Sequence, residues 1–279
     1  MFEKNRLLAM LERKQVPLGM QCFTGNPALI EVLGCTGFDF VMLDTEHAGN
    51  DPHAMEDLVR VSQHAGLVPF VRVPDRHDEG AIRRALEAGA SGVFLPMVRT
   101  VEDVRFAANS AFFPPQGTRG ICPATRAAGY AFNGFERYTE WSNAESLLIP
   151  MIEHPEGVQN IDAICAMEEV KVIVFGAGDL AYAMNEGTLM MKSPKVQEAY
   201  RIVLTAAKRH GVAVIGGPVL DPSPEACRKS LEDGISVFCL GLDILGFRRF
   251  CEQTVSALNT AIDDSGWQRP AAPPSGFHG

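Results

Sequence analysis

The sequence has no long apolar run, no Cys-x-x-Cys pair and an excess of acidic over basic residues. None of its apolar stretches approaches the roughly 18 residues that a membrane-spanning helix needs. The N-terminal segment carries charges along its length and has no apolar centre of the kind found in signal peptides. We therefore expect a cytoplasmic protein that does not associate with a membrane.

The balance of charge argues against nucleic-acid binding. The 279 residues include 25 Lys and Arg against 34 Asp and Glu, which gives a net charge of −9. Affinity for a phosphate backbone depends on clustered Lys and Arg, and no basic stripe with interleaved aromatic residues occurs here.

The seven cysteines are odd in number and lack paired spacing. They argue against structural zinc and against a disulfide framework, and they favour a reducing compartment.

Short apolar segments alternate with helical patterns along most of the chain. Several of the helical patterns end at a Gly, as helices commonly do, with Gly66, Gly89, Gly211 and Gly234 as examples. Repeated strand–helix units predict a parallel sheet, and eight units in about 250 residues fit an α/β fold of the TIM (β/α)8 type. A doubly wound open sheet is the alternative, but no Gly-x-Gly-x-x-Gly fingerprint follows the first strand. The expected strands cover residues 18–23, 39–45, 68–73, 92–98, 146–152, 171–176, 213–219 and 235–241.

The whole chain can be divided into one barrel and a short tail. We expect residues 1–264 to form a single barrel domain with an N-terminal helix over residues 2–14. Residues 265–279 are rich in Pro, Gly and Ala and are expected to form a disordered tail.

The connection from 99 to 145 is unusually long, and long connections inside compact domains are usually functional. Because it follows a strand, this connection should lie on the active-site face of the barrel.

Polar residues stand at or just beyond the carboxyl ends of several expected strands. In parallel barrels these ends converge on one mouth, which is where the active sites of such enzymes lie. The orientation of one of these residues, His154, is left open by the sequence. The residues are Asp44, Glu46, His47, Arg72, Glu153, His154 and Asp179.

Glu153 and Asp179 could hold a metal ion. Each follows an apolar strand, and two neighbouring carboxylates repel each other unless a proton or a cation lies between them. Oxygen ligands with open coordination positions suit Mg²⁺ or Mn²⁺. Alternatively, each carboxylate caps the helix that follows it, as Asp179 is well placed to do. The residues alone leave both interpretations open.

Arg72 and His47 have side chains suited to catalysis. Arg72 stands in an otherwise apolar strand, where it could stabilise an oxyanion or form a structural ion pair with Asp44 or Glu46. His47 follows acidic residues, and imidazole titrates near neutral pH, which suits a general base.

The small residues of 175–180 could expose backbone N–H groups to an anion such as a carboxylate, although tight turns need small residues too.

Several segments together resemble the HpcH/HpaI class II pyruvate aldolases. They are GFDFVMLDTEHAGND, VRVP, EAGASGVFLPMVRTVEDV, FPPQGTRG, LLIPMIEHPEGVQNIDAI and VIVFGAGDL, and they occur in this order. The Asp-x-Glu-His segment and the Pro-Pro-x-Gly-x-Arg-Gly loop are the most specific of them. The resemblance implies a TIM barrel of the phosphoenolpyruvate/pyruvate type that assembles as a hexamer, a trimer of domain-swapped dimers.

The same resemblance implies a reaction and a set of roles. The reaction is reversible, metal-dependent cleavage of a 4-hydroxy-2-oxo acid to pyruvate, or a close analogue, and an aldehyde, with Mg²⁺, Mn²⁺ or Co²⁺ as the metal. Glu87 falls where the family usually has an Asp from a neighbouring subunit that tunes the catalytic histidine. Asp44 is expected to orient His47 or order a metal-bound water. The other implied roles are metal ligands for Glu153 and Asp179, enolate stabilisation for Arg72, general base for His47, and a backbone site for the substrate carboxylate at Gly178 and Asp179.

Two departures from the family pattern leave the substrate open. Met151 occupies a substrate-contacting position that is usually Gln, and Gly-Ala-Gly-Asp replaces the usual Gly-Pro-Ala-Asp. One alternative is an acyl-CoA lyase of the citrate lyase β or malyl-CoA lyase type, for which Arg119 and Arg126 are the candidate phosphate ligands. Another is a non-catalytic family member. An imine mechanism is disfavoured, because Lys171 begins its strand at the wrong end of the barrel.

Overall fold

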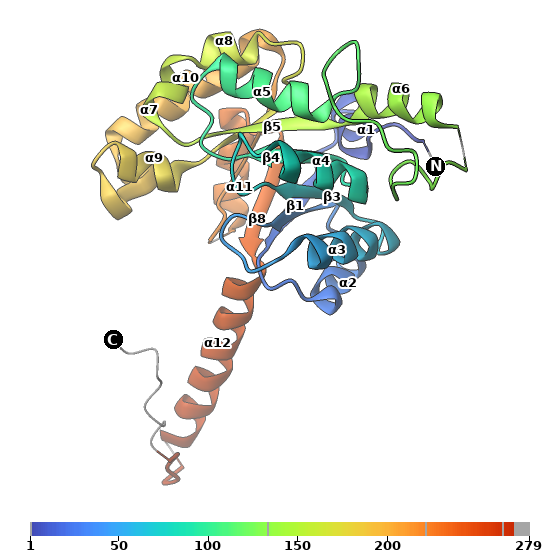
Figure 1. Cartoon of the computed structure of the whole chain (residues 1–279). Coiled ribbons are helices and arrows are strands. Elements are labelled where there is room, and N and C mark those ends of the chain that lie inside the picture. Colours follow the sequence, from blue (N-terminus) through green and yellow to red (C-terminus); the bar gives the residue numbers. More distant parts are fainter. Residues whose placement is uncertain (1, 133, 221, 264, 271–279) are drawn as a thin grey trace.

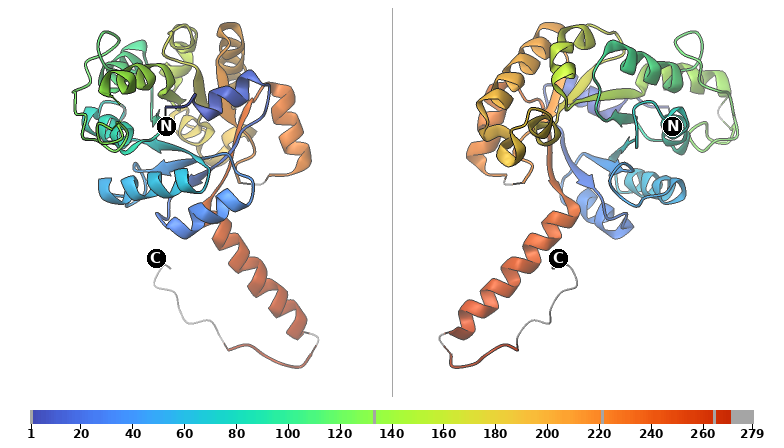
Figure 2. Two further views of the ribbon diagram at one scale, coloured as in Figure 1. Left: turned by 90° about the vertical axis from the view of Figure 1, so that its right-hand side faces the viewer. Right: turned by 60° about the vertical axis from the view of Figure 1, so that its left-hand side comes forward.

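The structure is a computed structural model that describes residues 2–132, 134–220, 222–263 and 265–270. Eight parallel strands follow one another around a closed barrel, as predicted, and helices surround it (Figures 1 and 2). The strands are β1 (Leu18–Cys22), β2 (Phe40–Asp44), β3 (Val68–Arg72), β4 (Gly92–Leu95), β5 (Leu147–Ile152), β6 (Val172–Phe175), β7 (Ala213–Gly216) and β8 (Val237–Leu242).

The helices lie mainly between successive strands. The predicted N-terminal helix is shorter than expected and packs its apolar face against the interior of the barrel. The helices are α1 (Arg6–Glu12), α2 (Pro27–Cys35), α3 (Pro52–His64), α4 (Glu79–Ala88), α5 (Val101–Ala111), α6 (Phe135–Glu145), α7 (Pro155–Gln159), α8 (Ile161–Cys165), α9 (Ala177–Ala183), the 3₁₀ helix η1 (Gly187–Lys192), α10 (Pro194–His210), α11 (Pro224–Asp233) and α12 (Asp243–Asp263).

Many helix ends are encoded locally. Several helices begin with a polar residue whose side chain accepts a backbone N–H bond and which is followed by Pro, a residue whose fixed φ suits the first helical turn. Gly89, Gly211 and Gly234 end α4, α10 and α11 in the left-handed conformation, as predicted. The polar–Pro starts are Asn26-Pro27, Asp51-Pro52, His154-Pro155, Ser193-Pro194 and Ser223-Pro224.

The boundaries of two predicted strands were wrong at their carboxyl ends. The strand predicted over residues 92–98 ends at Leu95, because Pro96 has no N–H and Met97 has a positive φ of 54°. The strand predicted over 213–219 ends at Gly216, where Gly217 turns the chain with a φ of 113°.

Two helix predictions also need correction. The pattern of apolar and charged residues over 158–168 predicts one helix, but the structure has two short ones, α7 and α8. They are separated at Asn160, whose side-chain amide donates to the Arg99 carbonyl at 2.9 Å. Helix α12 was not predicted at all, and it extends away from the barrel (Figures 1 and 2). Of the predicted tail, residues 271–279 lie outside the described residues.

Side chains of the strands alternate between the barrel interior and the surrounding helices. One apolar cluster fills the interior, and a larger one lies between strands and helices. Inside, Phe70 lies edge-to-face with Phe40 and with Phe94, at 5.9 Å between ring centroids in both pairs. The interior is therefore packed, and only its carboxyl end is open to chemistry. No helix in the described part of the chain is long and apolar enough to span a membrane.

Candidate active site

The alternation along the strands brings three predicted site residues to the same level of the barrel. Asp44 continues the inward series of β2, Arg72 that of β3, and Glu153 follows the inward residue Met151 of β5 at a spacing of two. All three are buried, with exposures of 0%, 6% and 4%. They form the top layer of the barrel interior, directly above the apolar core.

Arg72 forms a two-point ion pair with Asp44. Nε of Arg72 donates to Oδ1 of Asp44 at 2.9 Å, and Nη2 donates to Oδ2 at 2.7 Å. Nη1 of Arg72 lies 3.2 Å from Oε2 of Glu46. Burial by itself lowers the pKa of Arg72, but the hydrogen bonds and charge of Asp44 outweigh it, so the pKa is raised. The ion pair predicted as an alternative role for Arg72 is present, and it fixes the cation at the mouth.

Asp44 also shapes the turn that carries His47. Its Oδ1 accepts the backbone N–H groups of Glu46 at 2.9 Å and of His47 at 3.4 Å. The imidazole itself is open to solvent, with 59% of the side chain exposed, and Nε2 lies 3.5 Å from Oε2 of Glu46. A substrate at the mouth could therefore reach His47, whereas Asp44 is too buried to meet one.

Glu153 is a buried carboxyl group among other acids. Burial raises its pKa to about 7; the N–H of Met97, which donates to Oε2 at 3.0 Å, acts in the opposite direction. The charges of Asp179 and Glu46 raise the pKa further. Burial also raises the pKa of Glu46. The site thus holds more negative charge than Arg72 neutralises, which is the environment that a cation would relieve.

Asp179 lies in the first turn of α9 and is exposed. Gly176 occupies the capping position, and no side chain caps this helix, so the capping role considered for Asp179 is not what the structure shows. Gly176 packs on Glu153: a Cβ at this glycine would lie 2.4 Å from Cγ of Glu153. Glycine is therefore required here to let the turn approach the buried carboxylate.

The carboxylates of Glu153 and Asp179 fit a hard divalent cation that takes only some of its ligands from the protein. Within the described residues, no group of three or more His, Cys, Asp or Glu side chains forms a ready metal cage. Glu153 and Asp179 are instead two carboxylates whose charges act on each other across the mouth. Mg²⁺ and Mn²⁺ are commonly held by one or two carboxylates, with water and substrate completing the shell.

Three further predicted residues have distinct places. Met151 is 5% exposed and lies inside the barrel, one inward position below Glu153. His154 caps α7, since its Nδ1 accepts the N–H of Glu156 at 3.2 Å, so it faces the helix. Glu87 lies near the end of α4, shortly before β4 begins. That is the opposite end of the barrel from His47, so Glu87 could meet only the histidine of another copy.

The two arginines considered as phosphate ligands in the long connection, Arg119 and Arg126, are bound to other groups of the protein. Arg119 is 2% exposed and donates to the Tyr138 hydroxyl at 3.1 Å, with its guanidinium 4.6 Å from the centroid of the Phe113 ring. Arg126 donates to the Ala88 carbonyl and to Gln63, both at 2.6 Å. Both guanidinium groups hold the connection in place, which removes the phosphate ligands considered for an acyl-CoA lyase.

Two residues near the site that were not predicted, Phe23 and Asp243, lie directly after β1 and β8. Asp243, directly after β8, accepts the N–H groups of Phe23 and Thr24 at 2.9 and 3.0 Å. The ring centroid of Phe23 lies 5.6 Å from Cζ of Arg72. The rule that polar residues at strand ends mark the site could have identified Asp243, but the contact of Phe23 with Arg72 has no signal in the sequence.

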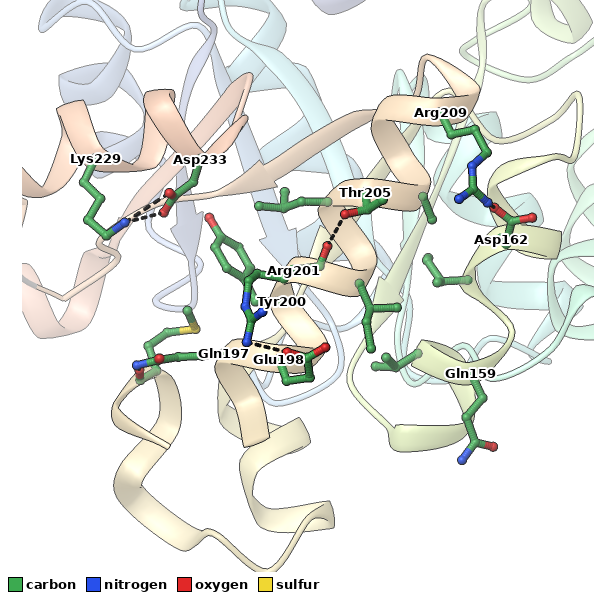
Figure 3. A pocket seen from close by; sticks show the side chains of 16 residues that line it. Gln159, Asp162, Gln197, Glu198, Tyr200, Arg201, Thr205, Arg209, Lys229 and Asp233 are labelled. Atoms are coloured by element: carbon green, nitrogen blue, oxygen red, sulfur yellow. Dashed lines mark hydrogen bonds and ion pairs between the residues drawn. The ribbon is translucent and has the colours of Figure 1, made fainter. Parts of the chain in front are cut away.

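A cavity of about 890 Å³ lies elsewhere, on the outer face around α10 (Figure 3). Charged side chains along it pair with one another: Lys229 lies 3.0 Å from Asp233, Arg201 pairs with Glu198, and Arg209 pairs with Asp162. None of the predicted site residues lines it. The reactive groups are therefore at the barrel mouth and not in this cavity.

The chain is similar to known proteins along most of its length. Residues 19–248 match the HpcH/HpaI aldolase/citrate lyase family. The 5-keto-4-deoxy-D-glucarate aldolase of Klebsiella pneumoniae is 34% identical over 91% of this chain and 96% of its own length. A family protein from Burkholderia cenocepacia superposes with a TM-score of 0.83 at 29% identity, over 92% of this chain and 100% of that one. The citrate synthase SbnG gives a TM-score of 0.83 at 27% identity, over 92% and 98%. The chain therefore belongs to the HpcH/HpaI aldolase/citrate lyase family and is an enzyme of the aldolase class.

Proposed function

We propose that the protein is a metal-dependent aldolase that reversibly cleaves a 4-hydroxy-2-oxo acid to pyruvate, or a close analogue, and an aldehyde. The observation that carries the proposal is Glu153, a buried carboxyl group with a pKa raised to about 7 beside Asp179 and the fixed Arg72 cation. A buried carboxyl group with a strongly raised pKa at a barrel mouth is typical of a functional site.

In this proposal Glu153 and Asp179 hold a divalent ion, Mg²⁺ or Mn²⁺. Such an ion supplies Lewis acidity toward the keto oxygen of a bound 2-oxo acid. Glu153 is held in place by the N–H of Met97 and by the close approach of Gly176. The backbone of Gly178 and Asp179, in the first turn of α9, serves the substrate carboxylate.

The remaining steps belong to His47 and Arg72. When the C3–C4 bond breaks, its electron pair stays on C3, and the C4 hydroxyl loses a proton as the aldehyde forms. His47, the exposed base of the site, accepts that proton. The fixed positive charge of Arg72 stabilises the negative charge that develops on the pyruvate fragment. Burial of Arg72 keeps water from weakening that interaction.

Two observations bear on the identity of the substrate. The K. pneumoniae relative is a 5-keto-4-deoxy-D-glucarate aldolase, which favours a keto-deoxy sugar acid. Met151 supplies a thioether where an amide is usual, so the contact below Glu153 is apolar in this chain. This difference favours a substrate or donor that needs no hydrogen bond at that position.

We further propose that the protein assembles through α12. The apolar side chains of this helix recur at spacings of three or four residues and are open to solvent, with exposures of 45% at Ile244, 59% at Phe247 and 51% at Leu258. The helix extends away from its own barrel (Figures 1 and 2). A second copy of the chain, as in a domain-swapped dimer, would cover this face, and a hexamer built from such dimers would bring Glu87 to another copy's site.

A metal-removal experiment tests the proposed reaction. The protein is treated with EDTA, and pyruvate formation is measured on a panel of 4-hydroxy-2-oxo acids, with and without added Mn²⁺ or Mg²⁺. We expect EDTA to abolish cleavage and either ion to restore it. The Glu153→Gln variant, which cannot form the metal site, should not be restored. Full activity in EDTA would contradict the metal mechanism.

A further inference from the structure

Asp243 joins the end of β8 to the loop that follows β1. Its Oδ1 accepts the N–H of Phe23 at 2.9 Å, and its Oδ2 accepts both the N–H and the hydroxyl of Thr24, at 3.0 and 2.6 Å. The residue is only 9% exposed. Charge-assisted hydrogen bonds of this kind are stronger than neutral ones, so the loop is fixed to β8 at several points.

The other side of the same loop touches the groups that surround Arg72. The Phe23 ring lies with its centroid 5.6 Å from Cζ of Arg72. Gly25 has a φ of 62°, and a Cβ there would lie 2.2 Å from Oδ1 of Asn50. Asn50 in turn donates to the backbone carbonyl of Asp44, the partner of Arg72, at 2.8 Å. The loop is thus held between Asp243 on one side and the Arg72–Asp44 pair on the other.

We propose that Asp243 is a positioning residue for the reaction, and that it acts by holding Phe23 against the guanidinium of Arg72. This inference rests on the proposed function, in which Arg72 stabilises developing negative charge. An aromatic ring near a guanidinium attracts it and excludes water from that side. Because Asp44 fixes only the edge of the guanidinium, Phe23 supplies a contact that the ion pair does not.

A purely structural role for Asp243 is the competing explanation. Its Oδ1 also accepts the N–H of Ile244 at 2.7 Å, so the carboxylate supports the start of α12. A structural role predicts that replacing Asp243 lowers the stability of the protein but leaves the environment of the Arg72 guanidinium unchanged. The positioning role predicts that removing either Asp243 or Phe23 changes the same property of Arg72, even though only Phe23 lies near it.

The test compares Asp243→Asn, Phe23→Leu and Phe23→Tyr in the full-length protein with Mg²⁺. Asp243→Asn replaces an oxygen acceptor with an NH₂ group, and Phe23→Leu removes the ring but keeps an apolar side chain. Asp39→Asn is the matched control: Oδ2 of Asp39 accepts the Leu18 N–H at 2.9 Å, at the opposite end of the barrel. The readouts are kcat, KM, melting temperature and the NMR signal of the Arg72 Nε–H, assigned by its loss in Arg72→Lys.

We expect kcat to fall by about tenfold to a hundredfold in Asp243→Asn and Phe23→Leu, with KM changing by less than about threefold. The Arg72 signal should shift in both, Phe23→Tyr should retain activity, and the double variant should lose little more than either single one. Asp39→Asn should lower the melting temperature without affecting kcat or the signal.

An unshifted Arg72 signal in Asp243→Asn or in Phe23→Leu would overturn the proposal, whatever happens to kcat. An additive loss in the double variant would overturn it as well. If the wild-type protein cleaves no 4-hydroxy-2-oxo acid, the proposed function fails, and the Arg72 signal still decides whether Asp243 positions this side chain.

Discussion

Asp44 and Arg72 are direct neighbours in the parallel ladder of β2 and β3, and their side chains join through two bonds of 2.7 and 2.9 Å. The register places both on the inner face at the last position of each strand. A buried pair of this kind holds the guanidinium rigidly, although it contributes less to stability than its short distances suggest. The pair instead holds a positive charge at a fixed position among the acidic side chains of the barrel mouth.

Removing Arg72 should therefore lower both stability and turnover, for two different reasons that can be measured separately. Arg72→Ala leaves Asp44 buried without a partner, so we expect the free energy of unfolding to fall by about 3–5 kcal/mol. We expect kcat to fall by about a hundredfold to a thousandfold, while metal affinity changes much less. The double variant Asp44→Leu/Arg72→Met should recover most of the stability but no activity. Wild-type kcat in Arg72→Lys would show that the guanidinium fork is not needed.

Two glycines of one turn offer a matched pair of substitutions. A Cβ at Gly176 would lie 2.4 Å from Cγ of Glu153, whereas at Gly178 it would meet only Cε of Met190, at 3.9 Å. We expect Gly176→Ala to displace Glu153 and weaken Mn²⁺ binding by about tenfold or more, and Gly178→Ala to leave it unchanged. Calorimetric titration with Mn²⁺ measures both. Equal affinities in the two variants would argue against Glu153 as a ligand.

The raised pKa of Glu153 predicts how the metal-free protein responds to pH. The folded-state pKa is about 7 against an ordinary 4.5, so between these values the folded protein binds a proton that the unfolded chain releases. Stability is therefore greatest at the acid end of this window, and Glu153 should reduce it by up to about 1.4 kcal/mol per pH unit as pH rises. Urea unfolding in EDTA from pH 5 to 7.5 measures the slope, which Glu153→Gln should flatten. An identical slope in that variant would contradict the assignment.

The exposed face of α12 predicts an effect on assembly. Phe247 and Phe250 have exposures of 59% and 64%. We expect Phe247→Glu/Phe250→Glu to dissociate the assembly to monomers, because the substitution places charge in an apolar contact. Gln253→Glu, which adds a negative charge at an exposed polar position of the same helix, should leave the assembly intact. Light scattering after gel filtration gives the molecular mass, and a wild-type value below that of a dimer would contradict the proposal.

The barrel could be predicted from the sequence because its signals are local. Apolar runs such as those ending at Asp44 and Arg72, polar–Pro helix starts and closing glycines each depend on a few adjacent residues. The same rule identified Asp44, Arg72 and Glu153, since a strand's carboxyl end is visible in the sequence. Helix α12 was not predicted, because it follows the last strand and many of its apolar side chains are exposed, so neither strand–helix alternation nor a buried face marks it.

What the sequence by itself determined is the order of strands and the identity of the acidic residues, the histidine and the arginine at their ends. Only the tertiary structure decided which groups meet: that Arg72 pairs with Asp44, that Arg119 is committed to the loop, and that Phe23 approaches Arg72. The physical reason is closure of the barrel. Closing β8 against β1 brings Asp243 to Phe23, contacts across some 220 residues that no local propensity encodes.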